Sequence, residues 1–128
     1  MPTNGELHGR MDEALNSGDL ETARGLMAED YVGHFSGQNP FAGDYRGRDA
    51  FFEVFQRINE ETGGNFSVEH REVLSSDEHS VALSRMSATR DGQQFEGDVA
   101  DICRWKDGRV VEEWILAFDQ QTFDAFWS

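Results

Sequence analysis

The spacing of apolar residues in this 128-residue chain changes at Gly64, and this change constrains the fold more than any other feature. Before Gly64, apolar side chains recur at helical intervals, most clearly at Phe51, Val54, Phe55 and Ile58. After it, extended runs are separated by turn residues, including two Asp-Gly pairs of the kind that close β-hairpins. Helices followed by an antiparallel meander predict an α+β fold.

The pattern predicts a short extended stretch at 31–35, a loop at 36–47, and three helices at 6–16, 20–29 and 48–61. Long strands are predicted at 66–74, 80–90, 94–105 and 109–119, and a short aromatic segment follows at 120–127. Strands this long must curl in a small sheet. We therefore expect one domain over residues 1–128, with a cone-shaped antiparallel sheet and three helices across its concave face.

The chain is strongly acidic, with 25 Asp and Glu residues against 11 Lys and Arg residues and a formal net charge of −14. This charge repels phosphate backbones and anionic membrane surfaces, so we expect neither nucleic acid nor a membrane as a partner. The single cysteine, Cys103, excludes an internal disulfide or a thiolate metal cluster, and no metal-ligand spacing is present. We therefore expect no metal and no cofactor. No signal peptide or membrane-spanning run is readable in the sequence, so we expect a cytoplasmic protein.

Four phrases, in this order along the chain, resemble the nuclear transport factor 2-like superfamily, in particular its SnoaL-like and ketosteroid isomerase-like branches. They are Asn16–Asp19, Tyr31–Phe35, Tyr45–Ala50 and Asp107–Trp114, and Asp119-Gln120 adds to them. The resemblance implies the cone fold with a pocket of ligand size. The superfamily holds isomerases, dehydratases, cyclases, epoxide hydrolases and non-catalytic modules, so the fold alone does not choose an activity.

The resemblance also implies which positions carry chemistry. Steroid isomerases use a base carboxylate on the short strand, a tyrosine on the first helix and a protonated aspartic acid on the penultimate long strand. Counted along this chain, these positions fall on His34, Met11 and Asp101. Asp101 retains the acid, His34 replaces the base carboxylate with another titratable group, and Met11 replaces the tyrosine. This set argues against ordinary steroid isomerisation.

His34 and Asp101 are therefore the candidate catalytic residues. Imidazole, with an ordinary pKa of about 6.5, suits a general base. Asp101 shares an apolar strand face with Val99 and Cys103, where burial disfavours an ionised carboxyl group and favours a neutral hydrogen-bond donor. Two alternatives stay open: Asp101 pairs with Arg85, or His34 is a core or rim histidine bonded to the backbone.

Seven further residues are expected to line the pocket: Tyr31, Phe35, Arg85, Val99, Cys103, Trp105 and Trp114. Arg85 could hold a polar ligand or pair with Asp101 or Asp119. The last strand leaves open whether its Trp114 face or its Glu113 face lines the pocket. We favour burial of both faces by sheet-to-sheet packing of two copies, so we expect a homodimer. His8 and His79 receive no role, and His70 is expected at the surface or at a dimer contact.

These observations predict a protein that binds a small apolar carbonyl compound, with acid-base catalysis of the isomerase or polyketide cyclase type. Two alternatives are a non-catalytic ligand-binding or dimerisation module and a dehydratase or epoxide hydrolase. The epoxide hydrolases of the superfamily that this chain resembles need an Asp-Arg-Asp set. Arg85, Asp101 and one further carboxylate could supply the set in number, but Ser87 interrupts the Arg-x-Asp spacing.

Overall fold

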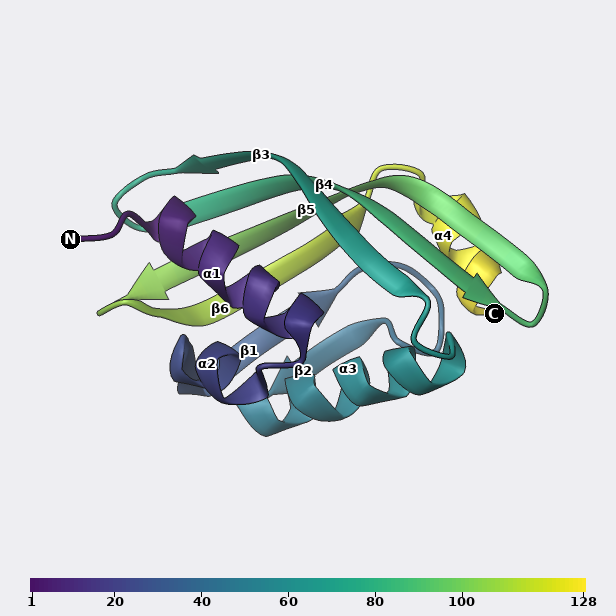
Figure 1. The fold of residues 1–128 in the computed structure, drawn as a ribbon, viewed down its shortest axis with the longest axis horizontal. Helices are drawn as coiled ribbons and strands as arrows, with labels where there is room; N and C mark the ends of the chain where they lie inside the picture. The colour runs from purple at the N-terminus through teal and green to yellow at the C-terminus, as the bar shows by residue number, and fades with distance from the viewer.

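The computed structural model describes all 128 residues as one curved sheet of six strands with four helices (Figure 1). The helices are α1 (Asn4–Ser17), α2 (Leu20–Gly25), α3 (Arg48–Glu61) and α4 (Gln120–Trp127). The strands are β1 (Met27–Phe35), β2 (Gly43–Arg46), β3 (Phe66–Ser75), β4 (His79–Arg90), β5 (Gln93–Lys106) and β6 (Arg109–Ala117). Their order in the sheet is β2-β1-β6-β5-β4-β3, with β1 parallel to β6 and every other pair antiparallel.

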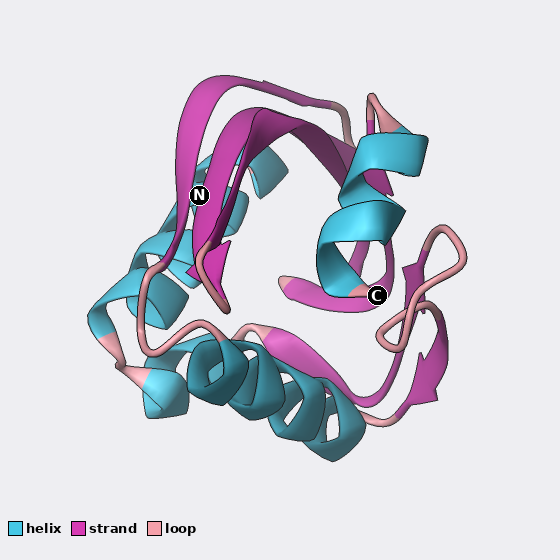
Figure 2. Ribbon diagram, turned by 90° about the vertical axis from the view of Figure 1, so that its right-hand side faces the viewer, coloured by secondary structure: helices cyan, strands magenta, loops and turns pink.

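The sheet curls because its central strands are long: β4 has 12 residues and β5 has 14. Register shifts in β1, β3 and β6 add bends of the kind that β-bulges produce. In the end-on view the strands arch over the top while helices close the left and lower sides, and α4 lies in front (Figure 2). The predicted α+β cone is confirmed.

Local sequence explains where the first helix begins and ends. At the start of α1, Thr3 Oγ1 accepts a hydrogen bond from the Glu6 backbone N–H at 3.1 Å, and the Glu6 carboxylate accepts one from the Thr3 N–H. Gly18 ends this helix with φ +81°, a conformation that glycine adopts without strain. The inner faces of the first and third helices bury His8, Met11 and Ala14 on α1, and Phe51, Val54 and Ile58 on α3.

The structure differs from the sequence-based expectation between residues 26 and 47. The second helix ends at Gly25 instead of continuing to residue 29, because Met27 and Tyr31 are completely buried on β1, which pairs with β6. Tertiary burial here overrides helical propensity. The expected loop contains the short edge strand β2, and the segment at 120–127 is the helix α4.

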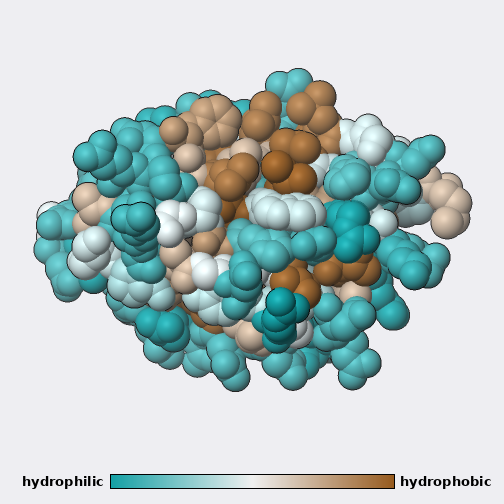
Figure 3. All heavy atoms as spheres, turned by 180° about the vertical axis from the view of Figure 1, so that it is seen from behind, coloured by the Kyte–Doolittle hydropathy of each residue, from teal (hydrophilic) through white to brown (hydrophobic).

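Two apolar clusters form the core. The first joins α1, α2 and β1 through Met11, Ala23 and Met27, and the second joins α3, β5 and α4 through Val54, Phe95 and Trp127. Seen from the side opposite to Figure 1, the surface carries apolar atoms near its middle, surrounded by hydrophilic side chains (Figure 3). No helix combines the length and apolarity that crossing a bilayer requires.

Candidate functional site

A cavity of about 120 Å³ lies between the helices and the concave face of the sheet. Of its 21 lining residues, 14 are hydrophobic, and members of both core clusters contribute to the wall. The polar lining residues are Asp12, Asn16, Ser36, Asn39, Ser84, Asp101 and Glu113. An apolar cavity with a few polar groups is the usual form of a small-molecule site.

Three carboxyl groups, which we call the carboxyl cluster, meet in this wall: Asp12 from α1, Asp101 from β5 and Glu113 from β6. Cys103 pairs with Glu113 in the sheet and Asp101 pairs with Ile115, so Asp101 and Glu113 are diagonal neighbours on the inward face. Asp12 lies one helical turn after His8 on the buried side of α1.

His8 of α1 makes hydrogen bonds to residues of β4 and β5 next to the carboxyl cluster. Its ring is completely buried, with Nε2 3.2 Å from Asp101 Oδ2 and 3.4 Å from Asp12 Oδ2. Its Nδ1 lies 2.6 Å from Ser80 Oγ, which also accepts a hydrogen bond from Trp105 Nε1 at 2.8 Å. Burial opposes a charge on this ring, but the hydrogen bonds and negative charges of Asp101 and Asp12 raise the pKa of His8 to about 11. His8 is therefore an imidazolium at neutral pH.

Asp12 is held between two imidazoles. His70 Nε2 lies 2.5 Å from Asp12 Oδ2, and His8 Nε2 lies 3.4 Å from the same oxygen. Burial alone favours the neutral acid, but the hydrogen bonds from His70 and His8, with their charges, lower the pKa of Asp12. Because its side chain keeps 15% of its surface exposed and lines the cavity, Asp12 presents an ionised carboxylate there.

Glu113 has the opposite protonation state. It is only 2% exposed, and the Tyr31 hydroxyl donates a hydrogen bond of 2.5 Å to its Oε1. Burial, followed by the charge of Asp101 and a hydrogen bond with Asp101, raises the pKa of Glu113 well above its usual range. The cavity wall thus holds an ionised carboxylate, Asp12, and a neutral carboxyl group, Glu113.

A family model described as the SnoaL-like domain matches residues 9–113. The chain belongs to the SnoaL-like family. Its sequence matches no curated protein.

Solved structures show the same fold as this SnoaL-like chain. Bal32a, from a soil-derived mobile gene cassette, is 34% identical with a TM-score of 0.94, covering 98% of this chain and 96% of that one. A protein of unknown function with a cystatin-like fold from Xanthomonas campestris is 23% identical with a TM-score of 0.92, covering 99% of each chain. IdmH, a proposed polyketide cyclase from Streptomyces antibioticus, is 23% identical with a TM-score of 0.78, covering 95% of this chain and 97% of that one.

Three of the residues expected in the pocket of this SnoaL-like domain lie in the cavity wall, namely Phe35, Val99 and Asp101. Of the two faces of β6, the one that carries Glu113 lines the cavity. Three other expected residues, Tyr31, Cys103 and Trp105, are buried behind this wall instead of in it. Cys103 Sγ lies 3.7 Å from Asp101 Oδ1, and burial raises the pKa of its thiol, so it is not a thiolate nucleophile.

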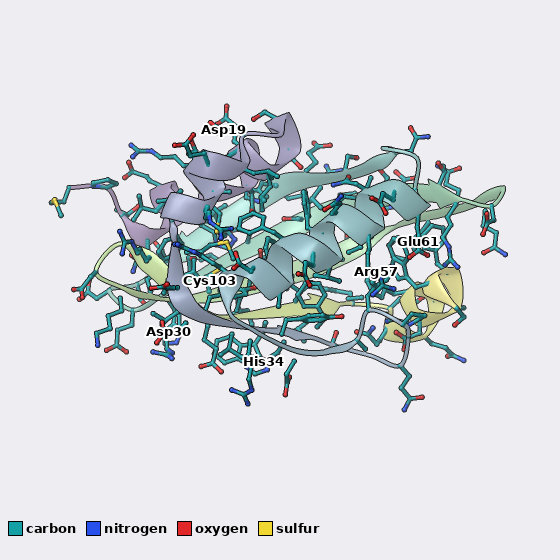
Figure 4. All side chains as sticks on the ribbon, turned by 90° about the horizontal axis from the view of Figure 1, so that it is seen from below. Asp19, Asp30, His34, Arg57, Glu61 and Cys103 are labelled. Carbon is teal, nitrogen blue, oxygen red and sulfur yellow. The ribbon has the colours of Figure 1, made fainter.

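The expectation that His34 faces the pocket is wrong. Its side chain projects outward from β1, whereas Cys103 lies inside between the helices and the sheet (Figure 4). Its Nδ1 and Nε2 each lie 2.7 Å from a carboxylate oxygen, of Asp44 and Glu112 respectively. The neighbour Phe35 faces the cavity, because successive side chains of a strand alternate. The count along the chain that placed the base position at His34 therefore missed the inward position by one residue, which reverses the face.

Arg85 and Trp114 also lie outside the cavity. Arg85 Nη1 lies 3.3 Å from Asp98 Oδ1, so its ionic partner is neither Asp101 nor Asp119. The Trp114 ring stacks on His34, with 5.5 Å between the ring centroids. Both follow from strand alternation, since the inward positions are taken by Ser84 on β4 and by Glu113 on β6.

Sequence reasoning missed His8, Asp12 and His70. A signal was present: His8 and Asp12 are four residues apart, beside the apolar helical stripe of Leu7, Met11 and Leu15, so both were bound to lie near the core. His70, expected at the surface or at a dimer contact, keeps 22% of its side-chain surface exposed, and its ring bonds to Asp12.

Two sets of side chains bring potential metal ligands within 4.8 Å of one another: His8, Asp12 and His70, and His8, Asp101 and Cys103. In the first set, Asp12 and His70 are 2.5 Å apart. Two ligands on one tetrahedral zinc ion would stand about 3.3 Å apart. The spacing of Asp12 and His70 is therefore that of a hydrogen-bonded acid-base pair.

Proposed function

We propose that this SnoaL-like protein binds a small apolar carbonyl compound in its cavity and moves a proton on it, as an isomerase or a cyclase does. The observation that carries the proposal is the presence of Asp12, ionised, and Glu113, neutral, in one apolar wall. Carboxyl groups whose pKa values are pushed apart by their surroundings are typical of an acid and a base acting together.

In the proposed reaction, Asp12 removes a proton from the carbon next to the carbonyl group. Negative charge then develops on the carbonyl oxygen. Glu113 and Asp101 share a proton, and they donate this proton to the carbonyl oxygen. The charge left on these two carboxyl groups is stabilised by the His8 imidazolium and by the Tyr31 hydroxyl. Asp12 then delivers its proton to another carbon of the enol, and the enol hydroxyl returns its proton to Glu113 and Asp101. Both carboxyl groups are thereby restored, and the isomerisation is complete with no net gain or loss of protons.

The surroundings support this assignment of roles. His70 and His8 hold the Asp12 carboxylate in one orientation, and 14 of the 21 lining residues are apolar, which lowers the local dielectric constant and strengthens charge interactions at the wall. No arginine lines the cavity, so nothing supports the Asp-Arg-Asp set of an epoxide hydrolase.

Proton transfer can be tested with cyclohexanone in D₂O, by following deuterium incorporation next to the carbonyl group by NMR. We expect the protein to accelerate exchange over buffer, and Asp12→Asn to lose about 10²-fold or more of that acceleration. Glu13→Gln, an exposed neighbour on the same helix, is the matched control and should retain it.

Two results would contradict the proposal. Binding of cyclohexanone without any exchange would mean that the cavity belongs to a non-catalytic ligand-binding module. Full exchange by Asp12→Asn would remove Asp12 as the base.

A further inference from the structure

Ser84 has a buried hydroxyl group with nothing to bond to in the protein. The residue is 3% exposed on the inward face of β4, lines the cavity, and its Oγ is the only buried side-chain polar atom of the chain without a hydrogen-bond partner. Buried polar groups in proteins are nearly always paired. An unpaired hydroxyl in the wall of a ligand-sized cavity indicates that a bound molecule supplies the partner.

The sheet register places this hydroxyl group beside the carboxyl cluster. Ser84 stands opposite Val99 on one neighbouring strand and opposite His70 on the other, while Asp101 stands opposite Ala82. Ala82 and Ser84 are successive inward positions of β4, so their rows are about 7 Å apart along the strand. A ligand that reaches from the carboxyl cluster to Ser84 must therefore have polar atoms at two ends.

The charges of the wall select against an anionic ligand. Three acidic side chains line the cavity, Asp12, Asp101 and Glu113, and no lysine or arginine does. The nearby cation, His8, is completely buried and already bonded to Asp12 and Asp101. A carboxylate or phosphate would lose its hydration without gaining a cationic partner, which is strongly unfavourable.

The volume sets the size of the ligand. The cavity measures about 120 Å³. An engineered dry cavity of about 150 Å³ in another protein holds one benzene molecule, and pockets for drug-sized ligands occupy about 300–1,000 Å³. The space therefore fits roughly one six-membered ring, whereas a compound of several fused rings is too large.

We propose that the ligand is an uncharged compound about the size of one six-membered ring, with a carbonyl oxygen at the carboxyl cluster and a second polar atom bonded to Ser84. The carbonyl end of this proposal rests on the proposed function. The second polar atom, the neutrality and the size rest on Ser84, on the charges of the wall and on the volume.

The test compares the affinities of cyclohexanone and 4-hydroxycyclohexanone, measured from the NMR shift of the Trp127 indole, which lines the cavity. The signal is assigned with Trp127→Phe. We expect the hydroxylated ring to bind roughly 2- to 10-fold more tightly to the wild-type protein, the range for one neutral hydrogen bond. Ser84→Ala should abolish this preference. Ser87→Ala should keep it, because Ser87 lies on the other face of β4 and its hydroxyl bonds to Ser67.

Two further probes test charge and size: cyclohexanecarboxylate and an uncharged four-ring steroid ketone should leave the Trp127 signal unshifted. An unchanged preference in Ser84→Ala, or binding of either of these two compounds, would overturn the proposal. These are binding measurements, so they stand whether or not deuterium exchange is observed. Absence of exchange with the Ser84-dependent preference intact would refute the chemistry alone.

Discussion

The Tyr31 hydroxyl donates a hydrogen bond of 2.5 Å to Glu113 Oε1, which joins a buried phenol on β1 to a buried carboxyl group on β6. Gly33 stands opposite Glu113 in the parallel pair, and a Cβ atom on Gly33 would come within 3.1 Å of the Tyr31 ring. Because Gly33 has no side chain, the Tyr31 ring can lie over it and its hydroxyl can reach Glu113. The carboxyl group in the cavity wall is positioned by two residues that lie behind it.

Tyr31→Phe should lower the free energy of unfolding by about 1–3 kcal/mol, because it leaves the buried Glu113 oxygen without its donor. Since the hydrogen bond from Tyr31 lowers the pKa of Glu113, its loss should also raise that pKa further. Urea denaturation measures the stability. Tyr45→Phe is the matched control and should cost less, because the Tyr45 hydroxyl bonds to the Phe41 carbonyl at a half-buried position. Equal losses in the two variants would contradict this account.

His34→Ala should leave deuterium exchange into cyclohexanone and the affinity for it within about twofold of wild type, since the imidazole lies on the outer face of β1. The measurement is the exchange assay described above, with Asp12→Asn as the inactive reference. A large loss of exchange in a folded His34→Ala protein would show that His34 takes part in the reaction after all.

The stability of the protein should fall as the pH rises above about 6.5. The pKa of His8 is raised from 6.5 to about 11 in the folded state, so the folded protein binds its proton more tightly than the unfolded chain does. The stabilisation is complete below pH 6.5 and is lost as the pH approaches 11. Urea denaturation between pH 6.5 and 9 measures this trend.

His34 also makes stability fall as the pH rises, because the hydrogen bonds of Asp44 and Glu112 raise its pKa. The control is therefore His8→Gln in a His34→Ala background, where this second contribution is absent. In that background the decline with pH should become shallower when His8 is replaced. An equally steep decline with and without His8 would show that its proton does not stabilise the fold.

We expect two copies of the chain to associate through the outer face of β6. Leu116 and Phe118 are 39% and 67% exposed, and together with the neighbouring Trp114 they form an apolar patch of the kind that association between chains covers. Light scattering should give a mass twice that of one chain, and Leu116→Lys should lower it to that of a monomer. Leu20→Lys, an exposed leucine on α2, is the control and should stay dimeric. A monomeric wild-type protein would exclude the dimer.

Much of the architecture follows from local sequence. The residues 48–61 form the helix that their spacing predicts, and both Asp-Gly pairs form tight turns between strands. In these turns Asp91 and Asp107 have φ values of +50° and +54°, and the glycine after each has a φ of +77°. Asp and Gly tolerate such values better than most residues. Helical periodicity and turn preferences depend on neighbours in the chain, so a single sequence is enough to read them.

Tertiary structure alone decided the composition of the site. His34 and Phe35 are adjacent, and the register of β1 in the sheet, not their identity, determines that the aromatic ring faces the cavity and the imidazole faces outward. His8 and Asp101 are 93 positions apart in the chain and are bonded in the fold. The charges of Asp12 and Glu113 differ for the same reason: a pKa depends on burial and on the partners that folding brings within hydrogen-bond distance, which the residue type does not specify.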